Sequence, residues 1–344
     1  VTYRPRLANN LGQLETDGFL RMIRDAGQTL YEVRQPNNPY PEIRSQLSRP
    51  YEGVVILGGY DVLPPQRLDV LPPSLRAQVG QTTSDADNFI VWNDEAYGDR
   101  DGDLLPELPV SRIPDAKSPK LVRAALMARL AANTDGRFGI RNVARPFANG
   151  PYGLLPGSAA LLVSQPAVPR SVGAGNARGA FVYIMLHGSD VDATRFWGED
   201  GGGVVEAMNI TNLPREFAGT VFTGCCWGAL TVNKLASQYR PGEPLGIRTS
   251  GSALSLSYLH AGARAFVGCT GTHYSPTVAP YDYFGGPMHA AFWQSYTQGE
   301  SPARALFAAK LAYINGLPHG QTTATGQAIE FKILRQFTCL GLGW

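Results

Sequence analysis

Long apolar runs, clustered basic residues and cysteines are all scarce in this sequence. No run reaches the roughly 18 apolar residues of a membrane span, so a membrane-spanning protein is not expected. The net charge is only +2 and no run of Lys or Arg occurs, which argues against a nucleic-acid partner. The four cysteines make no disulfide framework, and neither an HExxH motif nor a paired CxxC motif predicts catalytic zinc. This usage favours a reducing compartment such as the cytoplasm, although a chain that begins with Val1 leaves secretion of a processed form open.

The composition and the apolar pattern indicate a large α/β protein. With 344 residues, 44% of them hydrophobic and 17% charged, the chain can bury a sizeable core. Apolar runs of strand length alternate with helical spacing, which predicts mainly parallel sheets flanked by helices, in two side-by-side lobes over residues 1–138 and 139–344. The predicted strands are 29–33, 54–57, 89–92, 108–113, 143–147, 160–163, 181–186, 219–223 and 265–268. The predicted helices are 11–26, 41–47, 119–132, 227–239 and 302–315.

Two of the predicted strands end in residues that suit nucleophilic catalysis. Strand 181–186 leads into His187-Gly188, and strand 219–223 leads into Gly224-Cys225-Cys226. If the two strands are parallel neighbours, His187 and Cys225 emerge together at the carboxyl edge of the sheet, where α/β folds hold their ligands. A cysteine attacks as thiolate, which a nearby imidazole or a helix amino terminus after the thiol would favour. The amide groups of Gly188 and Cys225 would then bind a developing oxyanion.

The two strand ends resemble those of the gingipain type of caspase-like cysteine peptidases. The resemblance rests on His187-Gly188 after one apolar strand and on Gly224-Cys225 after the next, with Gly228 three residues beyond the cysteine. Other stretches that resemble this family are 51–64, 101–114 and 263–276. The carboxyl-terminal stretch 337–344 lacks the Gly-Asp-Pro of that family, and the stretch 141–180 is shorter than its gingipain counterpart.

The resemblance implies a cysteine endopeptidase with protein or peptide substrates. In this scheme Cys225 attacks the peptide carbonyl, His187 assists its ionisation and protonates the leaving amine, and water hydrolyses the acyl-enzyme. The chemistry requires no cofactor, and the family resemblance implies that an activating partner or a processing event controls activity. Two alternatives stay open at this point. One is a catalytically silent caspase-fold binding module, and the other is a thiol redox protein that uses Cys225-Cys226.

Two residues are candidates for the substrate pocket. Asp190 follows His187-Gly188-Ser189, and Tyr274 lies in the loop after strand 265–268, where the resemblance implies an aromatic pocket wall. A carboxylate at Asp190 would favour a basic substrate residue, because a desolvated Arg or Lys needs a charged partner. Asp190 is alternatively a residue that orients the imidazole.

An acidic stretch in the first half is a candidate calcium loop. Asp99, Asp101, Asp103 and Glu107 offer oxygen ligands at alternate spacing, and a glycine at position 102 supplies a turn. The stretch lacks the full twelve-residue EF-hand pattern, and a solvated acidic turn is the alternative. Any calcium here would be structural.

Overall fold

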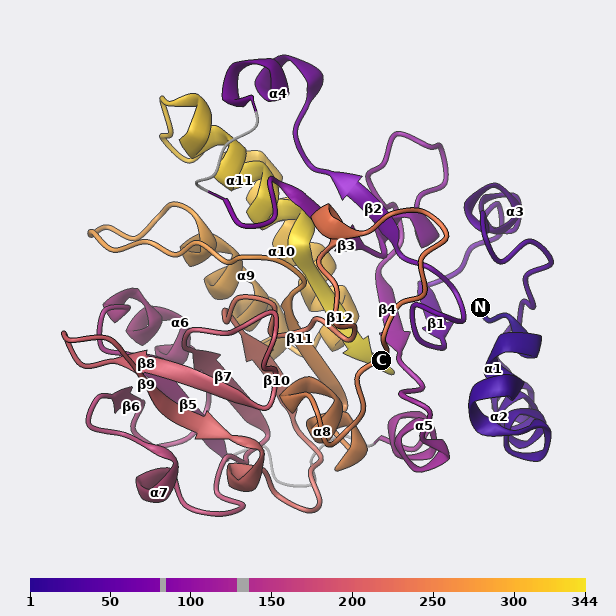
Figure 1. Ribbon diagram of the computed structural model, residues 1–344, viewed down its shortest axis with the longest axis horizontal. Helices are drawn as coiled ribbons and strands as arrows, with labels where there is room; N and C mark the ends of the chain where they lie inside the picture. The colour runs from indigo at the N-terminus through magenta and orange to yellow at the C-terminus, as the bar shows by residue number, and fades with distance from the viewer. Residues whose placement is uncertain (81–84, 129–135) are drawn as a thin grey trace.

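A single eight-stranded sheet organises the molecule. The computed structural model describes residues 1–80, 85–128 and 136–344. Helices lie on both faces of a sheet whose strands are mostly parallel, so the predicted α/β class is confirmed (Figure 1). The strands in spatial order are β1 (Val54–Leu57), β4 (Val110–Ile113), β12 (Phe337–Gly341), β11 (Ala265–Cys269), β10 (Thr220–Thr223), β7 (Phe181–Met185), β5 (Arg137–Asn142) and β6 (Leu162–Ser164).

The sheet consists of two parallel halves that run in opposite directions. Strands β11, β10, β7, β5 and β6 are parallel to one another, and β12, β4 and β1 form the other half. The halves meet where β11 pairs antiparallel with β12. The predicted boundary after residue 138 lies within β5, and that division into lobes stays a prediction. Strands from both predicted lobes belong to the one sheet.

Buried apolar side chains fill both faces of the central strands. In β7 the alternate residues Val182 and Ile184 face one core, whereas Phe181, Tyr183 and Met185 face the other. Such continuous apolar strands are expected where helices cover both faces. The first core includes α5 (Pro119–Leu126), α7 (Pro169–Val172) and α8 (Leu254–His260). The second includes α6 (Asn149–Gly153), α9 (Gly285–Thr297), α10 (Pro302–Gly316) and α11 (Ala324–Gln336).

Smaller elements complete the fold at the rim of the sheet. Helices α1 (Arg4–Leu11), α2 (Gln13–Asp25) and α3 (Tyr40–Arg44) pack against β1 and β4, and α4 (Pro73–Val79) packs on α11. Two antiparallel two-stranded sheets stand outside the main sheet, β2 (Gln66–Asp69) with β3 (Ile90–Asn93), and the hairpin of β8 (Arg195–Glu199) with β9 (Val204–Asn209). No helix in the described part of the chain has the length and apolar character to cross a bilayer.

Several predicted elements differ from the structure. The predicted strand 143–147 lies beyond the observed β5, and residues 29–33 form only an isolated bridge at Glu32. The predicted helix 119–132 begins as expected, because the Ser118 side chain accepts the Leu121 amide hydrogen bond. Its predicted end at residue 132 lies outside the described residues.

The predicted helix 227–239 is wrong, and this bears on the site. Only the short 3-10 helix η4 (Ala236–Gln238) forms there. The backbone after the adjacent cysteines bonds instead to the end of β11, since Trp227 N donates to Gly271 O and Ala229 N donates to Cys269 O. The apolar residues of this segment pack into a separate cluster with Trp92. No α-helix therefore begins directly after either thiol, since residues 227–239 are all described.

Candidate active site

The imidazole of His187 is held by a carboxylate at the carboxyl edge of β7. The main chain of His187 pairs with Trp197 of β8, with N···O distances of 2.7 and 2.9 Å. This pairing brings Glu199, at the end of β8, to the ring, where Glu199 Oε1 is hydrogen-bonded to His187 Nε2. The same oxygen accepts a hydrogen bond of 3.0 Å from Asn142 at the end of β5. The carboxylate therefore fixes the orientation of the imidazole through its Nε2.

The charge of Glu199 is favoured by these contacts. Partial burial alone would raise the pKa of the Glu199 carboxyl, but the hydrogen bonds from His187 and Asn142 outweigh it and hold that pKa below its ordinary value. An ionised Glu199 stabilises the imidazolium form that a general base reaches after it takes a proton. The pair therefore has the arrangement of a base with its orienting acid.

The register of β7 and β10 aligns Cys226, rather than Cys225, with His187. Ile184 pairs with Thr223 in the parallel ladder. Three residues beyond that pair lie His187 after one strand and Cys226 after the other, whereas Cys225 is level with Leu186. Figure 1 shows β7 and β10 side by side.

Cys226 is partly exposed and lies against the Gly188 backbone. A β-carbon on Gly188 would stand 2.0 Å from the carbonyl oxygen of Cys226, so only glycine permits this approach. The Sγ atom of Cys226 accepts a hydrogen bond from His273 N at 3.3 Å. Burial raises the pKa of the Cys226 thiol, and the nearby carboxylate of Asp87 adds to that rise. The amide groups of His273 and Gly188 and the ammonium group of Lys332 favour the thiolate and offset the rise only in part.

Cys225, the predicted nucleophile, has different surroundings. Its side chain is fully buried in the first core, 4.0 Å from the carbonyl oxygen of Ile184. Burial raises the pKa of the Cys225 thiol to about 12. Its amide, predicted as an oxyanion donor, donates instead to Thr223 Oγ1 at 3.0 Å. These surroundings disfavour Cys225 as the attacking thiol, and the assignment stays a prediction.

Solved structures of proteases have a similar fold. No protein-family model and no curated protein matches the chain. Gingipain R, an Arg-specific cysteine proteinase, matches with a TM-score of 0.52 and 11% identity over 88% of this chain. The complex of the pro- and mature domains of RgpB from Porphyromonas gingivalis gives 0.53 and 11%, again over 88% of this chain. A structure described only as a protease gives 0.52 and 15% over the same share, 88%.

The chain has the caspase-like fold of the gingipains. This likeness, at such low identity, concerns the fold alone. The chain covers 66% of gingipain R and 67% of each of the other two matched chains, so it spans about two thirds of their length. The predicted resemblance to the gingipain type is confirmed at that level.

The gingipain-like fold puts the two predicted pocket residues in different surroundings. The Tyr274 hydroxyl donates to Asp85 Oδ1 at 3.0 Å, and the Lys332 ammonium group is 5.7 Å from the centre of the Tyr274 ring. Asp190 instead lines an open cavity together with Arg248. Neither the pocket role of Tyr274 nor that of Asp190 is tested by this placement, and both stay predictions.

A buried ionic cluster supports the residue that follows Cys226. Asp87 accepts hydrogen bonds from the Trp227 indole at 2.9 Å and from Lys332 Nζ at 2.6 Å. Trp227 has a φ of 51°, a conformation that is uncommon for a bulky side chain. The cluster therefore holds Trp227 in a strained backbone conformation directly after Cys226. Strained residues of this kind often occur at functional sites.

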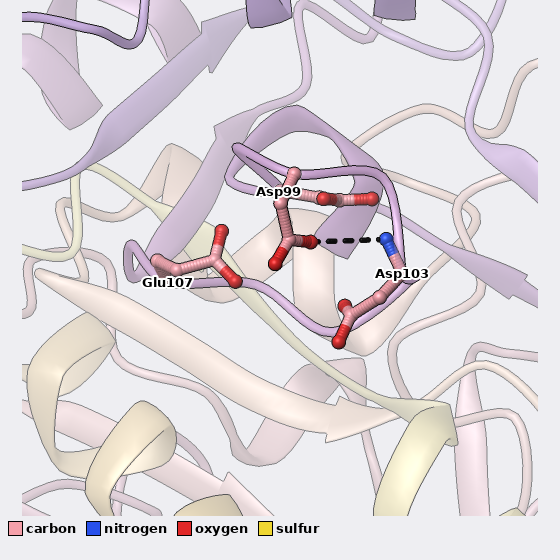
Figure 2. A group of neighbouring side chains, drawn as sticks. Asp99, Asp103 and Glu107 are labelled. Carbon is pink, nitrogen blue, oxygen red and sulfur yellow. Dashed lines mark hydrogen bonds between the residues drawn. The ribbon is translucent and has the colours of Figure 1, made fainter.

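The four acidic residues of the predicted calcium loop do lie together. Their ligand oxygens are all within 4.8 Å of one another, and Figure 2 shows the side chains grouped along one loop. Asp99 is buried and accepts the amide hydrogen bonds of Gly102 and Leu104 at 2.6 and 3.2 Å. Arg44 Nη2 lies 3.4 Å from Asp99 and already offsets part of the negative charge. An all-oxygen donor set fits Ca²⁺, and calcium binding by Asp99, Asp101, Asp103 and Glu107 stays a prediction.

The sequence reasoning missed Glu199, Asp87 and Arg248. An Asp200-Gly-Gly-Gly stretch follows Glu199 and is a hairpin signal, so the β8–β9 turn was predictable. Glu199 contacts His187 because the main chains of His187 and Trp197 pair, and no local sequence pattern predicts this pairing. Asp87 comes from far along the chain and carries no motif of its own.

Proposed function

We propose that this chain is a cysteine endopeptidase that uses Cys226, His187 and Glu199. The observation that carries the proposal is the alignment of the Glu199-bound imidazole with Cys226, a partly exposed residue, at the ends of neighbouring parallel strands. A nucleophile, a base and a group that orients the base are the parts that such catalysis needs. The gingipain-like fold supports the same conclusion.

The proposed reaction has two stages. His187 takes the thiol proton, and the Cys226 sulfur attacks the peptide carbonyl, whose oxygen becomes negative and is bound by the Gly188 amide. The imidazolium, stabilised by Glu199, then protonates the leaving amine as the peptide C–N bond breaks and a thioester remains. In the second stage His187 deprotonates a water, which hydrolyses the thioester and restores the thiol.

Peptide-library cleavage tests this proposal. The wild-type chain should release defined peptide fragments, and His187→Ala and Cys226→Ala should each abolish their release. The substrate is a protein or peptide, and control by an activating partner or a cleavage event belongs to the same proposal.

A silent binding module is the alternative, and labelling separates it from an enzyme. A catalytic thiol reacts with an electrophilic peptide ketone far faster than with a simple alkylating agent, because binding places the electrophile beside the sulfur. Equal rates with both reagents, together with no cleavage of the library, would favour the binding module.

A further inference from the structure

An open cavity lies beside the loop that follows His187. It has a volume of about 420 Å³, with Asp190 and Val191 on one side and residues 233, 246–248 and 252 on the other. Its size falls in the range of roughly 300–1,000 Å³ that is common for ligand sites. Arg248 in its wall contacts the main chain of Asp190, which follows His187 closely, and of Leu230, which follows Cys226 closely, so the cavity borders both segments that carry the candidate catalytic residues.

Arg248 differs from the other buried cations of the described chain. Its exposed fraction is 7%, and its guanidinium donates to two main-chain carbonyls, Leu230 O at 2.9 Å and Asp190 O. Each of the other buried Lys and Arg side chains has a carboxylate partner, namely Arg112 with Asp94, Lys310 and Arg335 with Glu95, and Lys332 with Asp85 and Asp87. Arg248 has no such ion pair among the described residues.

A buried cation without a close anion is unfavourable unless a ligand supplies one. Burial lowers the pKa of the Arg248 guanidinium, and the more distant carboxylates of Asp190 and Asp192 only partly oppose that effect. A carboxylate that entered the cavity would form an ion pair with Arg248. A guanidinium suits a carboxylate, because the guanidinium can present two parallel N–H donors to the two oxygens.

We infer that this cavity is a subsite for an acidic side chain of the peptide substrate, with Arg248 as its charged partner. The inference rests on the proposed peptidase function and names a specificity residue for it. It differs from the basic preference that Asp190 predicts. Asp190 lines the same cavity, and its carboxylate would weaken the binding of an acidic side chain without pairing with Arg248.

A Glu-for-Gln scan tests the subsite. A peptide that the wild-type chain cleaves is varied so that each position in turn carries Glu or Gln, which differ in charge and hardly in shape. At one position, kcat/KM should favour Glu by about tenfold or more, equivalent to about 1.4 kcal/mol. Arg248→Gln should bring that ratio close to one, and Arg248→Lys should retain part of it because the charge remains.

Asp190→Asn is the matched control, because it removes the opposite charge from the same cavity. It should increase the preference for Glu. The inference is overturned if no position favours Glu, if the Glu/Gln ratio survives in Arg248→Gln, or if Asp190→Asn selectively weakens cleavage after basic residues. Melting temperature and the rate at which iodoacetamide modifies Cys226 show whether Arg248→Gln keeps the fold and the thiol intact.

Binding separates a failure of the subsite from a failure of the peptidase proposal. If the wild-type chain neither cleaves a peptide nor reacts selectively with the electrophilic peptide ketone, the peptidase proposal fails, and calorimetry with a short capped Glu peptide and its Gln counterpart still tests the cavity. Tighter binding of the Glu peptide by about tenfold, lost in Arg248→Gln, would support the subsite. Equal binding of the two peptides would overturn it.

Discussion

Alanine substitution of the two adjacent cysteines should separate catalysis from packing. Cys226→Ala removes the thiol of a partly exposed residue, whose sulfur is hydrogen-bonded to the main chain of His273, so the free energy of unfolding should change by less than about 1 kcal/mol. Peptide turnover should fall by about 10⁴-fold or more, as it does when a hydrolase loses its nucleophile. Cys225→Ala removes a fully buried sulfur from the first core and should cost about 1 kcal/mol of stability. Its turnover should stay close to that of the wild type.

The assay combines turnover, covalent labelling and chemical unfolding of the same three proteins. An electrophilic peptide ketone should modify the wild type and Cys225→Ala, and fragmentation of the labelled peptide should assign the adduct to position 226. Urea unfolding shows that both variants are folded. The reasoning is refuted if a folded Cys225→Ala loses turnover and labelling while Cys226→Ala keeps both.

Three further predictions concern the carboxylate, the thiols and the acidic loop. Glu199→Gln should lower kcat by about 10²-fold or more with little change in KM, because its charge acts on the imidazolium rather than on the substrate. The folded-state pKa of Glu199 is depressed, so the carboxylate should stabilise the fold above about pH 4.3, the ordinary pKa of Glu. This stabilisation should disappear as the pH falls through the folded-state pKa. A difference in unfolding free energy between wild type and Glu199→Gln that is the same at every pH would contradict this. A maleimide added to the native protein should modify Cys226 alone, because Cys225, Cys269 and Cys339 are buried. The reaction should be faster as the pH rises, since the pKa of the Cys226 thiol is raised. Modification of a second thiol before unfolding would contradict the burial. Calcium should raise the melting temperature of the wild type, and Asp101→Asn with Asp103→Asn should remove that response; calorimetry without a calcium heat would favour the solvated acidic turn.

The central strands were predictable because their sequences are continuous apolar runs. Strands β7, β10 and β11 are buried along their whole length, so the sequence signal and the structure coincide. The strand β5 was placed several residues too late, because Arg137–Asn142 has only two large apolar residues among polar ones and glycine. The segment after the cysteines has helical spacing, yet its backbone bonds to β11, and tertiary contacts override the local pattern.

The meeting of a histidine and a cysteine at the ends of two strands was predictable, and the register decides which cysteine is level with His187. A strand-end pattern indicates that a histidine and a cysteine meet, but two adjacent cysteines point to opposite faces of the sheet. Only the pairing of Ile184 with Thr223 indicates which of them is level with His187. Contacts between separate segments place Glu199, Arg248 and Asp87 in the candidate site. A single sequence does not predict such contacts.

The position of β12 has a consequence for how the protein is synthesised. This strand is made from residues 337–341, yet it lies between β4 and β11 in the middle of the sheet (Figure 1). Until residues 337–341 have been made, no strand can lie between β4 and β11, and Lys332, which contacts Asp87, leaves the ribosome only shortly before them. Domains acquire their structure as units during translation. We expect the eight-stranded sheet to become continuous only when β12 joins β4 to β11.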